Sequence, residues 1–417
     1  GFSVASYNLT PGFTAVHDSY LKAVLGHIRQ WDPDVIADLA QKAKLFEPRK
    51  QLLLELVQIA EKEGQDLHRM PDDYDVWSHM SHAEKEIRAK LLFLNLNSHL
   101  VHRLEWGMLD TKERVEAFAD FIFETLQRKP NWGSSDFEIV QDMKTYLRFV
   151  EAQTALMSLG VDPVQIYDPF RSSWYTAGPR TTAEEPDIAA LAEVFRKEKP
   201  DLIVVNGEGF PDYGAHSTTE RSTIKAVQQL LNESDSPLKG VRIVQYAGVW
   251  ERVPRESAAF SVLHWGDEMR TFDRGFRNHY PSQAPPAVPD ASLRQHLHFS
   301  AQVMNNARET LQEISTLVKI PILLDPEIQD PDVGVLNYKI VDPGDPRVTE
   351  DFARRAEEMM RVKGALDKVK KASPPVPQVD PLSIYNKLRA IEQAGLPWYV
   401  LFNVKREAGP TLERVLA

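Results

Sequence analysis

The chain has 417 residues, 42% of them hydrophobic and 26% charged, which are ordinary fractions for a globular protein. Its 49 basic and 60 acidic residues give a net charge of −11, so the composition predicts no nucleic-acid partner. The absence of cysteine excludes disulfides, thiolate zinc ligands and cysteine nucleophiles. No apolar stretch is as long as a membrane span and no signal peptide is present, so we expect a cytoplasmic chain with no membrane partner.

The first residues have the pattern of a strand. Residues 2–7 alternate as in a strand, and the turn residues 10–12 follow it. A strand this close to the first residue fits either a genuine terminal strand or a chain that was cut inside a sheet.

Helical periodicity dominates from residue 19 to about residue 160. Breaks are predicted at Asp32-Pro33, at residues 70–73 and at residues 129–133. We therefore expect a large helical insertion over residues 21–143. Two histidine pairs on its helices, His79 with His82 and His99 with His102, have a spacing that could share a metal, but solvated or half-buried helix histidines are the better interpretation.

Strands and helices alternate after residue 160. A short strand at 164–167 precedes a helix whose capping box is Thr182 with Glu185, and a β-α-β unit follows over residues 201–246. Further helices are expected at 266–278 and 292–318. The predicted fold is α/β, with a Rossmann-like, mainly parallel sheet that carries helices on both faces. Residues 1–20 and 144–318 would form this domain, and residues 319–417 a C-terminal extension.

The turn inside the β-α-β unit is the first candidate site. Strand 201–206 ends before a glycine-rich turn, and the spacing of Ser217 and Glu220 predicts a helix start beside His216. Ligands bind at such a place in open α/β sheets. A neutral His216 nitrogen could coordinate a metal there, although a histidine that only caps the helix is the alternative. The same turn contains three further polar residues, Glu208, Asp212 and Tyr213.

The residues around this turn resemble a known motif. Residues 199–203, Gly207 and the Gly214-x-His216 pattern resemble the second motif of the PIG-L/LmbE-like zinc N-deacetylases. Within that family, the closest likeness is to the branch that occurs alone or fused to glucosamine-6-phosphate deaminase.

Three other stretches support the resemblance. Residues 4–16 resemble the family's second strand and its T-x-G turn. Arg148-x-x-Glu151, with the glycine at 160, resembles an R-x-x-E helix and the L-G-V that follows it. Residues 279–283, HYPSQ, resemble the H-x-S-Q that closes the homologous region.

This resemblance implies a Rossmann-like fold and a zinc-dependent hydrolase that removes the acetyl group from an N-acetylglucosamine-type amino sugar. It implies that His216 is a zinc ligand and that a sugar is the small-molecule partner; a homo-oligomer is compatible with the sequence. Catalytic roles would fall to Tyr213, as a hydrogen-bond donor to a developing oxyanion, and to Asp212. Substrate binding would fall to Arg148, Glu208 and His279.

The chain also departs from the family pattern. The H-P-D-D motif, which supplies two zinc ligands and the general base, is not in this chain, and Tyr213 stands where the family has a histidine. Either an upstream segment completes the site, or the chain is a non-catalytic homologue that binds a sugar or a partner. It could also be the companion part of a deaminase-type fusion. A rearranged site in which Glu208 or Asp212 joins His216 is the remaining alternative.

Overall fold

The computed structural model describes two compact units, Gly1–Ser172 with Leu263–Val335, and Ser173–Val262 with Leu336–Ala417. We describe each unit by itself. No helix in the described part of the chain is both long and apolar enough to span a bilayer. The residues described are 4–7, 16–63, 76–102, 108–128, 138–163, 166–167, 185–207, 215–247, 252–253, 255–264, 271, 275, 278–283, 288–290, 295–297, 303, 306–313, 334–348, 350 and 354.

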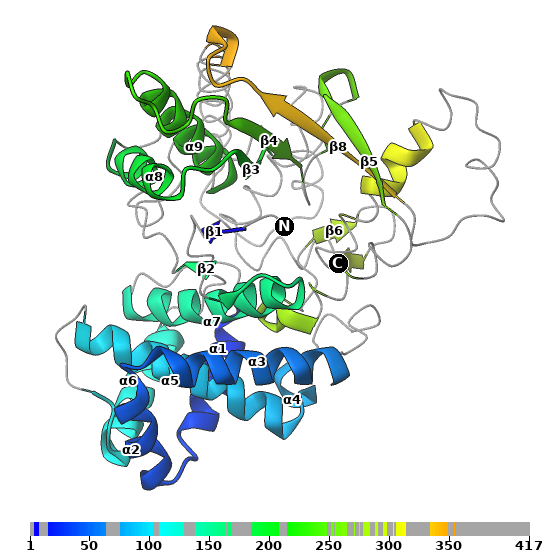
Figure 1. Ribbon diagram of the computed structural model, residues 1–417. Coiled ribbons are helices and arrows are strands. Elements are labelled where there is room, and N and C mark those ends of the chain that lie inside the picture. Colours follow the sequence, from blue (N-terminus) through cyan, green and yellow to red (C-terminus); the bar gives the residue numbers. More distant parts are fainter. Residues whose placement is uncertain are drawn as a thin grey trace, which may run out of the picture. The chain divides into compact units, whose positions relative to one another are not determined.

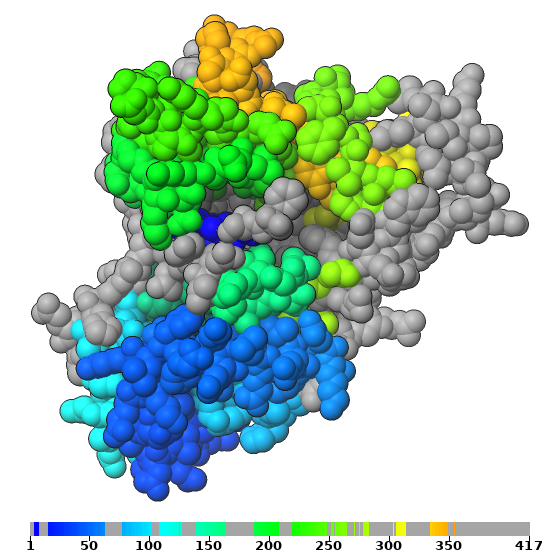
Figure 2. All heavy atoms as spheres, viewed as in Figure 1, coloured from blue at the N-terminus to red at the C-terminus, as the bar shows by residue number. Residues whose placement is uncertain are grey.

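The first unit is built mainly from helices, as the periodicity predicted (Figure 1). Figure 2 shows the helices coloured blue to cyan packed against one another as one continuous body. The predicted break at Asp32-Pro33 is confirmed, because Asp32 is the N-cap residue of the second helix and Pro33 its first residue. The helices are α1 (Asp18–Ile28), α2 (Pro33–Lys42), α3 (Phe46–Glu63), α4 (Val76–His79), α5 (His82–His102), α6 (Lys112–Arg128) and α7 (Glu138–Ser158).

Helix α5 lies at the centre of this unit. It begins after Ser81, whose hydroxyl accepts the backbone N–H of Glu84. It packs against α1, α2, α3 and α7. Four consecutive residues, 91–94, are at most 1% exposed. A helical stretch that is buried around its whole circumference must be surrounded by other elements, and residues 91–97 of α5 are such a stretch.

Helix α7 is one uninterrupted helix across a boundary that the sequence analysis placed at 143/144. Its residues Met143 and Leu147 belong to the same hydrophobic core as α1, α2, α5 and α6. The boundary expected at 20/21 likewise falls inside α1. Both expected boundaries of the helical insertion therefore lie inside helices that pack into the same core. Gly160 has φ +86° in the turn after α7, a conformation that favours glycine.

Two short strand pairs complete the first unit. Strand β1 (Ser6–Tyr7) pairs in parallel with β2 (Ile166–Tyr167). They lie within the strands that the sequence predicted at 2–7 and 164–167. Strand β6 (Val288–Asp290) pairs antiparallel with β7 (Gln295–Leu297). The prediction of a helix from residue 292 is therefore wrong over β7, because pairing with β6 supplies the backbone partners there. Residues 306–313 are helical, as predicted.

The second unit contains a four-stranded sheet in the order β3-β4-β8-β5. The predicted β-α-β unit is confirmed as β3 (Leu202–Asn206), α9 (Ala215–Leu231) and β4 (Arg242–Tyr246), and β3 and β4 are parallel. Strand β8 (Gly334–Val341) runs antiparallel to β4, so the sheet is mixed. The other members are β5 (Phe260–His264) and helix α8 (Glu185–Glu198), which packs against α9.

The two faces of this sheet differ. Ile203, Val205 and Ile243 are buried on the face against which α9 packs. Alternate residues point to the opposite face, where Val204 is 57% and Ile340 47% exposed. Within the part of this unit that the structure describes, helical cover is thus seen on one face only, whereas helices on both faces were expected.

Candidate functional site

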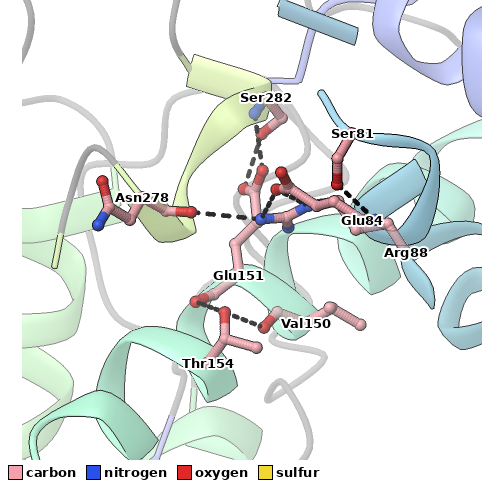
Figure 3. A network of polar contacts seen from close by, with 8 residues as sticks. All are labelled: Ser81, Glu84, Arg88, Val150, Glu151, Thr154, Asn278 and Ser282. Atoms are coloured by element: carbon pink, nitrogen blue, oxygen red, sulfur yellow. Dashed lines mark hydrogen bonds and ion pairs between the residues drawn. The ribbon is translucent and has the colours of Figure 1, made fainter. Parts of the chain in front are cut away.

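A buried cluster of charged residues lies between α5, α7 and residues 278–283 of the first unit (Figure 3). Arg88 is paired with Glu84 one turn earlier on α5 at 2.8 Å, and their side chains are 2% and 9% exposed. Arg88 Nη2 also donates to the carbonyl oxygen of Asn278 at 3.3 Å. Removing one partner of a buried ion pair strongly destabilises the folded protein, so we expect the fold to depend on both Glu84 and Arg88.

Glu151 on α7 joins two stretches that are 131 residues apart in the sequence. Its two carboxylate oxygens accept hydrogen bonds from the backbone N–H and the hydroxyl of Ser282, both at 2.7 Å. One of them also accepts from Arg148 Nη1 at 2.8 Å. Glu151 is 1% exposed. The Arg148-x-x-Glu151 motif thus forms an ion pair on α7, and Glu151 is also bonded to the 279–283 stretch.

Arg148 and Tyr280 form a second contact between the same two stretches. The Arg148 guanidinium carbon lies 4.6 Å from the centre of the Tyr280 ring, a cation–π geometry. Burial raises the pKa of Tyr280. The Arg148 side chain is 18% exposed, so the cluster reaches solvent at this residue.

His279 is 1% exposed, and its Nδ1 atom has no hydrogen-bond partner in the structure as described. Burial lowers its pKa to about 4, and the positive charge of Arg88 acts in the same direction, so the imidazole is neutral at pH 7. Arg148 Nε is a second buried atom with no partner there. Leaving a buried polar atom unsatisfied costs about 1–3 kcal/mol.

The turn expected to contain the catalytic residues lies in the second unit. Glu208, Asp212 and Tyr213 fall outside the described residues. Helix α9 begins at Ala215, two residues before the helix start that the sequence predicted at Ser217. His216 is the second residue of α9, and the His216 side chain also lies outside the described part.

The described residues beside this turn are closely packed. Gly207 N–H donates to the carbonyl oxygen of Tyr246 at 2.7 Å. A Cβ atom on Gly207 would lie 2.7 Å from Gln245 Cβ. Gln245 Nε2 in turn donates to Glu220 on α9 at 2.6 Å. The start of the turn is thus fixed against β4 and α9.

No cluster of three potential metal ligands occurs among the residues that the structure describes. The structure describes the side chains of three of the four paired histidines, all except His102. His79 and His82 are exposed. His99 is buried, with Asp142 at 2.6 Å from its Nε2 and the Tyr146 hydroxyl at 3.0 Å from its Nδ1.

Sequence reasoning found Arg148 and His279 but missed Glu84 and Arg88. Their four-residue spacing on a helix predicts an ion pair, but Glu86 and Lys90 on the same helix have it too, so the sequence pattern does not mark the first pair as buried. The structure brings Arg148 and His279 into one cluster through Glu151 and residues 278–283.

Comparison of the chain with protein-family models, with curated proteins and with solved structures finds no significant match.

Proposed function

We propose that this chain is a zinc-dependent hydrolase that removes the acetyl group from an N-acetylglucosamine-type amino sugar, built on a Rossmann-like α/β domain. The observation that supports it most is the bonding of Glu151 to Ser282. The sequence resemblance assigned the R-x-x-E helix and the H-x-S-Q stretch to one homologous region, and the two stretches are in direct contact.

The strand, turn and helix around His216 give further support. Strand β3, helix α9 and strand β4 form the predicted parallel unit, and His216 lies in the first turn of α9. Ligands bind beside the carboxyl ends of such strands. His216 would be one zinc ligand. The metal, when bound, would acidify a water molecule and polarise the acetamide oxygen.

The remaining roles belong to side chains of this chain. Tyr213 would donate a hydrogen bond to the oxygen that becomes negative as the amide is attacked. Asp212 would act in proton transfer at the reacting amide. Arg148, Glu208 and His279 would bind the hydroxyl groups of the sugar. A Tyr213→Phe variant is expected to lose turnover, and undiminished turnover would remove the phenol from the mechanism.

The test combines metal content with acetate release. The purified chain should contain about one zinc ion and should release acetate from an N-acetylated glucosamine. His216→Ala should lose both. His82→Ala is the matched control, because His82 is an exposed histidine at the start of α5, and it should keep both.

A chain that binds no zinc and releases no acetate would contradict the hydrolase. Sugar binding without either property would instead favour the non-catalytic homologue.

A further inference from the structure

One face of the sheet in the second unit presents exposed apolar side chains. Val204, Val244 and Ile340 are neighbours across β3, β4 and β8, and Tyr246 lies beside Tyr338 in the next row. A stacked aromatic ring on β5 extends this surface beyond Tyr338. Apolar side chains gathered in this way mark a place of contact. We call this surface the open face, and its members that are between 39% and 57% exposed are Leu202, Val204, Tyr246, Phe260 and Ile340.

The chain turns tightly after β8 and then becomes helical. Asp342 Oδ1 accepts the backbone N–H of Gly344 at 2.9 Å, which closes the turn. Asp345 Oδ1 accepts the backbone N–H of Arg347 at 2.9 Å, as an N-cap residue does. So short a connection from a strand leaves the helix beside the same sheet. The helical residues that the structure describes here, at the end of β8 in Figure 1, are 346–348, 350 and 354.

The start of this helix shows which of its sides is turned inward. Val348 is half-buried, whereas Arg347, Glu350 and Arg354 are exposed. Glu350 and Arg354 are one turn apart and share a side of the helix, and Val348 lies on the other side. Helical spacing continued along the sequence places an apolar stripe on the Val348 side and charged residues opposite it. The stripe consists of Phe352, Ala356, Met359, Val362, Leu366 and Val369.

The opposite face of the sheet is already filled beside β8. Asn337 and Val341 point to the face that α9 covers, and they are 7% and 4% exposed. Ile340 points to the open face and is 47% exposed. Residues 336–417 belong to the same compact unit as β3 and β4. The place that remains for an apolar stripe in this unit is therefore the open face.

We propose that residues 348–369 form a helix whose apolar stripe covers the open face. The occupant of this surface is thus a segment of the chain itself and not a partner protein. The helix runs antiparallel to β8, because the chain reverses direction in the turn after that strand. Its packing removes apolar surface of both the stripe and the sheet from water, and it gives the sheet helices on both faces.

The chain contains no cysteine, so single introduced thiols report on this surface. The thiol of Val204→Cys should react with a maleimide about tenfold more slowly than that of Gln229→Cys, because the helix shields the open face and Gln229 is exposed on α9. Equal reaction rates of the two thiols would overturn the proposal.

Cross-linking tests which side of the helix meets the sheet. Ala356→Cys and Glu357→Cys alter adjacent residues that lie on opposite sides of the predicted helix. Each is combined with Val204→Cys and treated with a short dimaleimide. The Ala356 combination should cross-link within one chain, and the Glu357 combination should not. Equal yields from both combinations would overturn the proposal, and so would cross-links that join two chains, which would make a second copy the occupant.

A charge placed in the stripe should uncover the sheet. In Met359→Asp the thiol of Val204→Cys should react about tenfold faster than in the parent, because a buried carboxylate opposes the packing of the stripe. Arg361→Asp is the matched control on the charged side and should leave the rate unchanged. If Met359→Asp does not fold, Met359→Ser is the milder variant and should raise the rate to a smaller degree. An unchanged rate in the folded stripe variant would overturn the proposal.

Discussion

Gly207 lies so close to strand β4 that there is no room for a side chain at this position. An added Cβ would meet Gln245 Cβ at 2.7 Å, and that atom is attached directly to the β4 backbone, so it cannot move aside cheaply. We expect Gly207→Ala to lower the free energy of unfolding by about 1–3 kcal/mol. Urea unfolding followed by circular dichroism measures this change.

Gly26 offers the matched control for that substitution. It lies within α1, and a Cβ added there would meet no atom within 4 Å. Gly26→Ala should raise the free energy of unfolding by about 0.5–1 kcal/mol, because alanine loses less conformational freedom in a helix. Equal effects of the two substitutions would contradict the close approach at Gly207.

His279 makes the stability of the chain depend on pH. Its pKa is about 4 in the folded chain, below its ordinary value near 6.5. As the pH falls below 6.5, the unfolded chain takes up a proton that the folded chain does not bind until pH 4. The free energy of unfolding should therefore fall by up to about 1.4 kcal/mol per pH unit across that window.

Urea titrations at pH 7 and pH 5, on the unaltered chain and on His279→Leu, measure this contribution. The variant should show a smaller loss between the two pH values. Some loss should remain, because burial also lowers the pKa of His17 to about 4. A variant with the same pH dependence as the unaltered chain would show that His279 can be protonated where it lies.

The buried residue Asn337 adds side-chain hydrogen bonds between strand β8 and its surroundings. Its Nδ2 donates to the carbonyl oxygen of Val253 at 3.1 Å, and its Oδ1 accepts from the hydroxyl of Ser261 on β5 at 2.7 Å. Asn337→Ala leaves that carbonyl oxygen without its donor and should cost about 2–3 kcal/mol of unfolding free energy. Ser261 is exposed, so Ser261→Ala should cost at most about 1 kcal/mol.

Hydrogen exchange locates the effect of these two substitutions. Amide exchange should accelerate along β8 in Asn337→Ala and remain slow there in Ser261→Ala. Equal exchange in both variants would mean that Asn337 does not fasten the strand.

The elements were predictable to different degrees. The helical character of residues 19–160 and the β3-α9-β4 unit followed from periodicity, because apolar residues repeat there at the spacing of one buried face. The insertion of β8 beside β4 did not, since its register joins residues about a hundred positions apart, such as Val244 and Ile340. The β6-β7 hairpin was missed because the pattern around residue 292 was interpreted as helical.

At the scale of the whole molecule, the helices of the first unit have a core of their own. All its described buried members lie between Val16 and Leu147. We expect residues 16–163, expressed alone, to fold into a helical protein that unfolds cooperatively in urea, because every described member of this core lies inside the fragment.

Residues 16–128 provide the comparison, because that fragment lacks α7. It loses Met143 and Leu147 from the core, and it loses Lys144, which is 1% exposed and paired with Asp18. Asp18 would remain without its partner. This shorter fragment should show less helical circular dichroism per residue and no sharp transition; a sharp one would mean that α7 is dispensable to the core.

The sequence by itself determined the helical content of residues 19–160, the mixed α/β class and the β-α-β unit that contains His216, because these depend on the local spacing of apolar residues. It also identified Arg148 and His279 as candidates, through a resemblance. Only the tertiary structure decided that Glu151 bonds to Ser282, that Arg88 holds Asn278 and that His279 is buried with Nδ1 unsatisfied. These are contacts between segments 131 and 190 residues apart, and no local pattern encodes which distant backbone group a buried charge will find.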